Sequence, residues 1–382
     1  MTAARVAVLT PGGRGAIASL VVSGGVELID HHRLFEAANG RRLAEQDPGR
    51  ICYGFWGGDS NALPNEQVVV CRTGESRVEL HCHGGAAAVQ RILEDLVGSG
   101  AIRCDWADLV VAPSGSPASR IEVELAEVLA AATTWQVAAI LLDQQAGVLV
   151  STLERLAATG WDQRHQAAAC VAGLLEWSDL GRRLVDPPTV VLSGGPNVGK
   201  SSLLNALLGF GRAIVWDQPG TTRDVVTGRT ALEGWPVRLA DTAGLRATED
   251  EIEAVGVEHA RRELNTADLV VLVVDRSHPL DGLTRQLVHE WPDAVVVANK
   301  CDLEDATDGV LPDGALMVSA LTGEGLDELA GAIVARLVPG VPEPGTAVPV
   351  SERLIGCLEE VARAIDAGDE TGFRSALTET IA

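Results

Sequence analysis

One stretch of eight residues limits the fold of this chain more than any other. It reads Gly194-Gly-Pro-Asn-Val-Gly-Lys-Ser201, between an apolar run at Thr189–Leu192 and a helical stretch at Ser202–Leu208. Its glycines let the backbone curl so that successive N–H groups face phosphate oxygens where the helix begins. Lys200 would then place its charge on the β- and γ-phosphates, and the Ser201 hydroxyl would bind Mg²⁺. The stretch predicts a strand, a phosphate-binding loop and a helix.

Apolar runs alternate with polar or amphipathic stretches from residue 189 to about residue 337. The runs are Thr189–Leu192, Val237–Ala240, Leu269–Val274, Ala294–Ala298 and Ala315–Val318. This alternation is typical of a mostly parallel sheet covered on both faces. Polar motifs follow several of these runs, each at a predicted strand end.

Three of those strand ends carry motifs for a guanine nucleotide. Asp241-Thr-Ala-Gly244 offers a carboxylate that holds Mg²⁺ through water and a Gly244 N–H that meets the γ-phosphate. In Asn299-Lys-Cys-Asp302, the Asp302 carboxylate can accept from N1–H and the 2-amino group of guanine, an arrangement that adenine lacks. Ser319-Ala320 can offer backbone N–H groups to guanine O6. The four motifs, in this order, predict a protein that binds and hydrolyses GTP.

We therefore assign a P-loop GTPase domain with a defined set of contacts. Between the phosphate loop and Asp241 lies Pro219-Gly-Thr-Thr-Arg-Asp224, and we assign Thr222 to the Mg²⁺ shell with Ser201 and Asp241. The catalytic set includes Lys200 and Gly244. The residues assigned to GTP are Asn197, Val198, Gly199, Lys200, Ser201, Ser202, Asp241, Thr242, Ala243, Gly244, Asn299, Lys300, Asp302, Ser319 and Ala320.

The rest of the chain divides into two further zones. Up to about residue 115, a helical stretch at Ala86–Leu96 and short β-rich runs predict a small α+β domain. The runs are Val6–Leu9, Leu20–Val22, Gln67–Cys71 and Arg77–Cys82. Residues 118 to 183 are rich in Ala, Leu, Glu and Gln at helical spacing, and a last helical segment, Ser351 to about Asp366, follows a proline-rich linker. We expect an α+β domain over 1–116 and a helical domain formed by 117–186 and 343–382. The GTPase domain, 187–342, is inserted into the helical domain.

Composition bears on partners and compartment. The formal net charge is -23, which disfavours broad electrostatic attraction to nucleic acid or anionic membranes. The seven cysteines show no paired spacing, and no apolar run is long enough to span a bilayer. We expect a cytoplasmic protein with reduced thiols and no membrane partner.

The residues quoted above also carry a family resemblance. The run GGPNVGKSSLLNALLG, with AIVWDQPGTTRDVV and DTAGLRATEDEIEAVGVEHA after it, resembles the G domain of the tRNA modification GTPase family MnmE, also called TrmE. The resemblance implies an N-terminal folate-binding domain and a helical domain with the G domain inserted. It also implies K⁺-stimulated hydrolysis of GTP to GDP, a homodimer, and a flavin-dependent partner in modifying the wobble uridine of tRNA.

The resemblance assigns further residues to catalysis. Leu245, which follows Gly244, cannot polarise water, and the family uses a glutamate further along instead. Glu253 matches it, with Glu249 and Glu251 as alternatives, and would orient the attacking water. Asn197 matches a K⁺-ligating asparagine, and the remaining K⁺ oxygens would come from Trp216, Gln218 and Thr221. The simpler interpretations are a turn residue for Asn197 and a solvated helix charge for Glu253.

The N-terminal zone matches the family less well. Glu79 and His83-Gly84-Gly85 fit its folate-binding pattern, but Val21 stands where an arginine is expected. The segment Pro113–Ser119 lacks the expected lysine, and the sequence ends in SALTETIA rather than the family's C-x-G-K tail. These departures count against folate binding at Glu79 and against one-carbon transfer. The alternative hypothesis is a GTPase whose nucleotide state switches its binding to another protein, without a folate or tRNA role.

Overall fold

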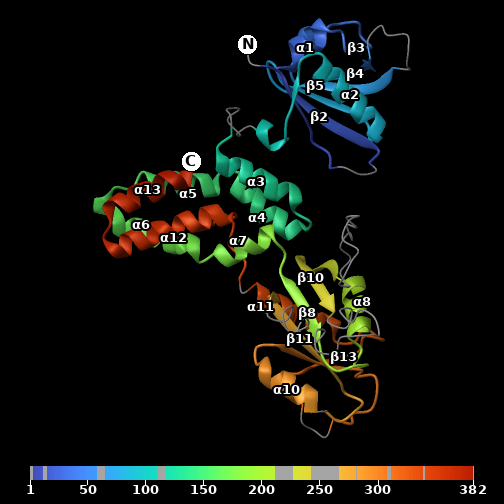
Figure 1. The fold of residues 1–382 in the computed structure, drawn as a ribbon, viewed down its shortest axis with the longest axis vertical. Helices are drawn as coiled ribbons and strands as arrows, with labels where there is room; N and C mark the ends of the chain where they lie inside the picture. The colour runs from blue at the N-terminus through green and yellow to red at the C-terminus, as the bar shows by residue number, and fades with distance from the viewer. Residues whose placement is uncertain are drawn as a thin grey trace, which may run out of the picture. The chain divides into compact units, whose positions relative to one another are not determined.

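The computed structural model describes residues 3–11, 15–57, 65–110, 118–210, 227–241, 266–280, 282–307, 311–338 and 340–381. The chain divides into two compact units, Met1–Ala126 and Glu127–Ala382 (Figure 1). The helix α3 (Arg120–Ala131) spans the boundary.

The first unit is built on a seven-stranded sheet in the order β3-β4-β5-β6-β2-β1-β7. Neighbouring strands are antiparallel except β1 and β7. Ala18, Leu20 and Val22 alternate into a core that helix α2 covers, as a half-buried strand requires. The elements are β1 (Arg5–Val8), β2 (Ile17–Ser23), α1 (Gly25–His31), β3 (Phe35–Ala37), β4 (Ile51–Trp56), β5 (Glu66–Arg72), β6 (Val78–His83), α2 (Ala86–Gly98) and β7 (Ile102–Arg103).

The prediction of a small α+β fold here is confirmed, although the sequence pattern missed β3, β4, β7 and α1. Strand β4 shows why: Gly54 occupies an inward-facing position where an apolar side chain would have marked the strand. A Cβ at this position would clash with the carbonyl of Glu36 and the ring of Phe35. The close approach of β3 therefore requires glycine and hides the strand from hydrophobic patterning.

The second unit contains a sheet and a group of six helices that pack against one another. Four of these helices precede the sheet in the sequence and two follow it. Helix α12 contacts α6 and α13, and α13 contacts α5, although about 200 residues separate the two groups (Figure 1). Ser351 caps the start of helix α12, because its hydroxyl accepts from the N–H of Leu354, and Gly368, with φ of 71°, caps its end. The bounds are α4 (Trp135–Gln145), α5 (Val148–Ala157), α6 (Arg164–Leu175), α7 (Ser178–Val185), α12 (Glu352–Ala367) and α13 (Glu370–Ile381).

None of the helices in the described ranges is by itself long and apolar enough to cross a bilayer. Helices α4 and α5 pass that test of length and composition only as a pair, which is bent by 42°.

The proline-rich segment before α12, which the sequence predicted as a linker, is fixed to these helices. Gln144, at the end of α4, donates to the carbonyl of Thr346 at 3.0 Å and accepts from the N–H of Val348 at 3.0 Å. Val348 is fully buried, and a Cβ at Gly181 of α7 would clash with the carbonyl of Pro349. The segment 345–349, which we call the return strap, is therefore part of the packed structure.

The remaining sheet has six strands in the order β13-β12-β11-β8-β10-β9. All neighbours are parallel except β9, which pairs antiparallel with β10 at one edge. Val270 and Leu272 pack towards α10, while Val271 and Val273 are buried on the opposite face. The elements are β8 (Thr189–Ser193), α8 (Lys200–Phe210), β9 (Thr227–Leu232), β10 (Trp235–Asp241), β11 (Leu269–Asp275), α10 (Gly282–Glu290), β12 (Val295–Asn299), β13 (Leu316–Val318) and α11 (Leu326–Leu337). The predicted, mostly parallel α/β sheet is confirmed. The edge strand β9 was not predicted from the sequence.

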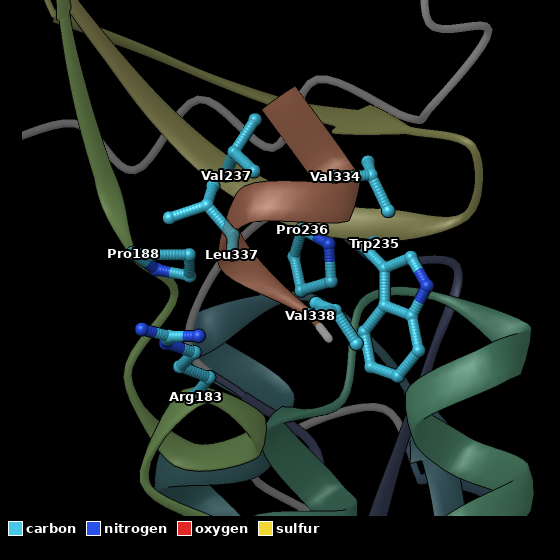
Figure 2. A pocket seen from close by; sticks show the side chains of 8 residues that line it. All are labelled: Arg183, Pro188, Trp235, Pro236, Val237, Val334, Leu337 and Val338. Carbon is cyan, nitrogen blue, oxygen red and sulfur yellow. The ribbon is translucent and has the colours of Figure 1, made fainter. Parts of the chain in front are cut away.

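The chain enters and leaves this sheet at neighbouring points. Pro188, just before β8, and Val338, just after α11, line one apolar crevice with Trp235 of β10 (Figure 2). Arg183 of α7 lines the same crevice. Beside it, the guanidinium of Arg238 on β10 donates to both carboxylate oxygens of Asp186, which follows α7. The start of β8 and the strand β10 thus both lie against the end of α7.

Candidate nucleotide-binding site

The phosphate loop adopts a backbone that two of its residues can form only as glycine. Gly194 has φ of 146° and Gly199 has φ of 96°, values that residues with a Cβ rarely adopt. A Cβ at Gly194 would also clash with the carbonyl of Val273, and one at Gly199 with the side-chain amide of Asn299. The loop is therefore pressed against the ends of β11 and β12, and the two glycines allow that contact.

Lys200 lies inside the loop at the first position of α8. Its side chain is buried, with 7% of the residue exposed, and Nζ donates to the carbonyls of Gly194 at 3.0 Å and Gly195 at 2.7 Å. The ammonium group thus lies in the mouth of the loop, beside the N-terminal end of a helix. Positive charge and helix N–H groups together define a site for phosphate.

A hydroxyl and a carboxylate meet beside the loop. Ser201 Oγ donates to Oδ2 of Asp241 at 2.6 Å, and Asp241 is buried at the end of β10. Oxygen ligands of these two kinds are those that Mg²⁺ prefers in nucleotide sites. The donor set of Ser201 and Asp241 therefore fits the predicted magnesium position.

Asn299 joins three strand-end loops. Its amide Nδ2 donates to the carbonyl of Val198 at 2.9 Å, and its Oδ1 accepts from the N–H of Ala320 at 3.1 Å. The residue is 2% exposed, so both bonds form away from solvent and are costly to leave unmade. Asn299 thus fixes the position of the phosphate loop relative to the Ser319–Ala320 loop.

Lys300 makes a parallel connection. Its Nζ donates to the carbonyl of Asn197 at 3.0 Å and forms an ion pair with Oδ2 of Asp275 at 2.6 Å. Asn197 and Lys300 have φ of 63° and 65°, a left-handed backbone that is uncommon for residues other than glycine. Asp275 was not among the residues predicted from the sequence. The feature of the sequence that could have identified it is a carboxylate at the end of an apolar strand. In the sheet, Asp275 of β11 pairs directly with Asn299 of β12.

The carboxylate of Asp302 is oriented by a buried hydroxyl. Ser319, which is fully buried, donates from Oγ to Oδ1 of Asp302 at 2.5 Å, while Asp302 itself is exposed at the edge of the sheet. The N–H groups predicted to meet guanine O6 have partners within the protein: that of Ser319 donates to the carbonyl of Glu324, and that of Ala320 to Asn299. Their assignment to guanine stays a prediction.

The structure brings together most of the predicted nucleotide residues. These residues lie at the carboxyl-terminal edge of the sheet or in the loop and helix that follow β8. They are Asn197 to Ser202, Asp241, Asn299, Lys300, Asp302, Ser319 and Ala320. Several predicted residues lie outside the described ranges, namely Trp216, Gln218, Thr221, Thr222, Thr242, Ala243, Gly244 and Glu253.

These lysines are the only two in the chain. Of its 30 lysine and arginine residues, Lys200 and Lys300 alone are lysine, and both lie in this site. Elsewhere the chain uses arginine for every fixed positive charge.

The candidate folate residues lie on the sheet of the first unit. Glu79 is on β6, half-buried and in register with Val21 of β2. Val21 is fully buried in a small apolar cluster with Ala7 and Leu109, so no cation occupies the position where the family pattern places arginine. Gly84 is needed for close packing, because a Cβ there would clash with the carbonyl of Gly15.

A parallel sheet edge that carries a glycine loop with lysine, a magnesium-type carboxylate and an Asn-Lys-x-Asp motif defines a P-loop GTPase. The model of the 50S ribosome-binding GTPase family matches residues 189–300. Curated relatives extend the match: the tRNA modification GTPase MnmE of Bacillus licheniformis is 33% identical over 94% of this chain and 88% of its own length. The MnmE of Geobacillus kaustophilus is 34% identical over 96% of this chain and 90% of its own length. That of Bacillus subtilis is 32% identical over 94% of this chain and 88% of its own length.

The chain therefore belongs to the MnmE family of tRNA modification GTPases, and it is an enzyme that binds and hydrolyses GTP. Among solved structures, the G domain of the T. maritima FeoB iron transporter is 29% identical, covering 39% of this chain and 98% of that one. Its TM-score is 0.29, so this likeness adds nothing to the assignment.

Proposed function

We propose that GTP hydrolysis by this chain drives modification of the wobble uridine of tRNA, in the cytoplasm and together with a flavin-dependent partner. The observation that carries the proposal is the fixed guanine and phosphate contact set: Asn299 and Lys300 hold the phosphate loop, and Ser319 orients Asp302. This set of residues suits a GTPase that repeatedly binds and hydrolyses GTP, rather than one that has lost nucleotide binding. The family resemblance over nearly the whole chain supports the tRNA substrate.

Two cations would assist the reaction. Ser201, Thr222 and a water on Asp241 would hold Mg²⁺, which neutralises charge on the β- and γ-phosphates when bound. Asn197, Trp216, Gln218 and Thr221 would hold K⁺ as a second fixed charge beside the phosphates. Support comes from the Ser201–Asp241 bond and from the left-handed backbone of Asn197, which Lys300 fixes. Initial rates in KCl and NaCl test the K⁺ site: we expect turnover in KCl alone, and equal rates would contradict it.

The hydrolytic step needs a group that orients water. We assign this to Glu253, while Lys200 and the N–H of Gly244 stabilise charge on the γ-phosphate oxygens as the bond to the leaving GDP breaks. Lys200 is already in the loop, where its Nζ contacts two carbonyls.

The domain division is part of the proposal. We assign residues 1–116 to an N-terminal domain, 117–186 with 343–382 to a helical domain, and 187–342 to the inserted GTPase domain, in a homodimer. The division is supported by the packing of α12 on α6, by the return strap on α4, and by the neighbouring entry and exit points of the sheet.

Complementation tests the function as a whole. A bacterial strain that lacks its own MnmE would receive this chain or its Asp302→Asn variant, and its tRNA nucleosides would be quantified by mass spectrometry. We expect the chain to restore the modified wobble uridine and the variant to fail. Unmodified tRNA with a well-expressed, GTP-hydrolysing chain would overturn the tRNA assignment while leaving the GTPase assignment intact.

One observation favours a second candidate, a nucleotide-switched GTPase that binds a partner protein without folate. Val21 is packed among Ala7 and Leu109, so this position offers no cation to a folate carboxylate. Calorimetric titration with a reduced folate distinguishes the two candidates. Micromolar binding would exclude the second, and no binding together with unmodified tRNA in the complemented strain would favour it.

A further inference from the structure

Asp275 ends strand β11 at the edge where the nucleotide site is built. It pairs in register with Asn299, and the N–H of the next residue, Arg276, donates to the carbonyl of Asn299 at 3.0 Å. The Asp275 side chain is 13% exposed. It belongs to none of the four nucleotide motifs, yet it contacts one of them directly.

The carboxylate of Asp275 is surrounded by donors. Oδ2 forms the 2.6 Å ion pair with Lys300 Nζ and lies 3.3 Å from Nδ1 of the exposed His278. Oδ1 accepts from the Ser277 hydroxyl at 2.6 Å and from its N–H at 2.9 Å. These bonds fix the carboxylate in one orientation, with one oxygen directed at Lys300.

Lys300 passes that constraint to the phosphate loop. Its Nζ is held between Asp275 and the carbonyl of Asn197, and a peptide group is planar and trans, so a carbonyl fixed on one side directs the following N–H to the other. Holding the carbonyl of Asn197 outwards therefore turns the N–H of Val198 towards the inside of the loop. Asn299 does the same for the next peptide, since it holds the carbonyl of Val198 and so directs the N–H of Gly199.

We propose that Asp275 is a positioning residue of the GTPase: it holds Lys300 on the carbonyl of Asn197 and thereby sets the N–H groups of the phosphate loop for the nucleotide. The charge of Asp275 matters because a charge-assisted bond from an ammonium group is stronger than a neutral one. Without it, Lys300 is free to turn to solvent, and the left-handed backbone at Asn197 loses a constraint that maintains it.

The effect should fall on phosphate binding and leave base recognition unchanged. Asp302 is oriented separately by Ser319, through a bond that does not involve Asp275 or Lys300. A variant of Asp275 should therefore weaken GDP and inosine diphosphate by the same factor, because both have the same phosphates. A general loss of structure at this edge would instead change the ratio of the two affinities.

The test uses the full chain and fluorescent GDP. We expect Asp275→Asn to raise the Kd for GDP about tenfold and the KM for GTP similarly, with kcat within twofold of the wild type, and Asp275→Glu to restore most of the affinity. In a Lys300→Met background, Asp275→Asn should have no further effect, since the lysine through which it acts is gone. Asp305→Asn is the matched control, because Asp305 pairs with Arg276 at 3.3 Å and the structure gives it no bond to Lys300.

Three results would overturn the proposal. They are a Kd for GDP within twofold of the wild type in Asp275→Asn, the same tenfold loss in the Lys300→Met background, and a changed ratio of GDP to inosine diphosphate affinity. Thermal unfolding of every variant identifies misfolded protein. If Asp275→Asn unfolds, Ser277→Ala, which removes one donor to the same carboxylate, should raise the Kd in the same direction, and an unchanged Kd would then overturn the proposal.

Discussion

The hydroxyl of Ser319, a fully buried residue, donates to Oδ1 of the exposed Asp302 at 2.5 Å. The same Oγ accepts from the N–H of Thr322 at 3.1 Å. The base-selecting carboxylate is therefore held by the loop that follows β13, and two strand ends contribute to a single specificity element.

Replacing Asp302 should change base preference more than it changes stability. Asp302→Asn exchanges one acceptor oxygen for a donor, which faces the N1–H and 2-amino donors of guanine, so we expect GDP affinity to fall at least a hundredfold. Xanthosine diphosphate, which presents an acceptor at position 2, should bind the variant better than GDP does. Competition against fluorescent GDP measures both. Ser319→Ala should give a smaller loss of about tenfold, and an unchanged guanine preference in Asp302→Asn would refute the assignment.

Gly199→Ala should abolish tight nucleotide binding. Its φ of 96° is strained for any residue with a Cβ, at a cost of about 1–2 kcal/mol, and the new methyl group would displace the side chain of Asn299. Equilibrium binding of GDP measures the loss. Gly209→Ala in α8 is the control, because a Cβ there meets no neighbour within 4 Å, and it should bind like the wild type.

Gln144→Ala should destabilise the second unit. The variant leaves the carbonyl of Thr346 and the N–H of Val348 without their side-chain partner in the return strap, at a cost of about 2 kcal/mol. Urea unfolding followed by circular dichroism measures this. Within the described ranges the neighbour Gln145 makes no side-chain bond, so Gln145→Ala should stay within about 0.5 kcal/mol of the wild type. Equal effects in the two variants would contradict the role of the strap.

Glu253→Ala should slow hydrolysis and leave nucleotide affinity unchanged. This prediction comes from the sequence alone, and its physical reason is that a residue touching the attacking water stabilises the transition state without binding the ground state. We expect kcat to fall about a hundredfold. Single-turnover hydrolysis and GDP binding separate the two effects, and a large rise in the Kd for GDP would refute the assignment.

Acid should weaken the Asp275–Lys300 link. Burial alone would raise the pKa of Asp275, but the bonds from Lys300 and Ser277 outweigh it and hold the pKa below its ordinary range. The unfolded chain, with a carboxyl pKa of about 3.9, then binds more protons than the folded chain, so stability falls as pH drops from about 5 through the native pKa. The exposed His278 also faces this carboxylate, with Nδ1 3.3 Å from Oδ2.

Denaturant unfolding at pH 6, 5 and 4 tests the link. The wild type should lose more stability across this range than Asp275→Asn, which cannot titrate there. Parallel losses in the two proteins would show that Asp275 does not contribute.

The sequence predicted what local chemistry determines. Parallel strands such as Leu269–Asp275 are continuous apolar runs, and the phosphate and guanine motifs follow them at fixed positions. Features that depend on distant segments were not predictable. Gly54 gives no apolar signal because β3 approaches it, and the return strap looks like a free linker until Gln144 is seen to hold it. Asp275 lacks a motif, because its role arises from strand pairing with Asn299.

The restriction of lysine to positions 200 and 300 has a practical consequence. An amine-selective reagent can modify this chain at those two side chains and at the terminal amine. Acylation there removes the charges that hold phosphate and the loop. Immobilisation through either lysine would therefore block nucleotide binding. Conversely, a nucleotide that covers the two ammonium groups should lower their acylation, and mass spectrometry counts the acyl groups added.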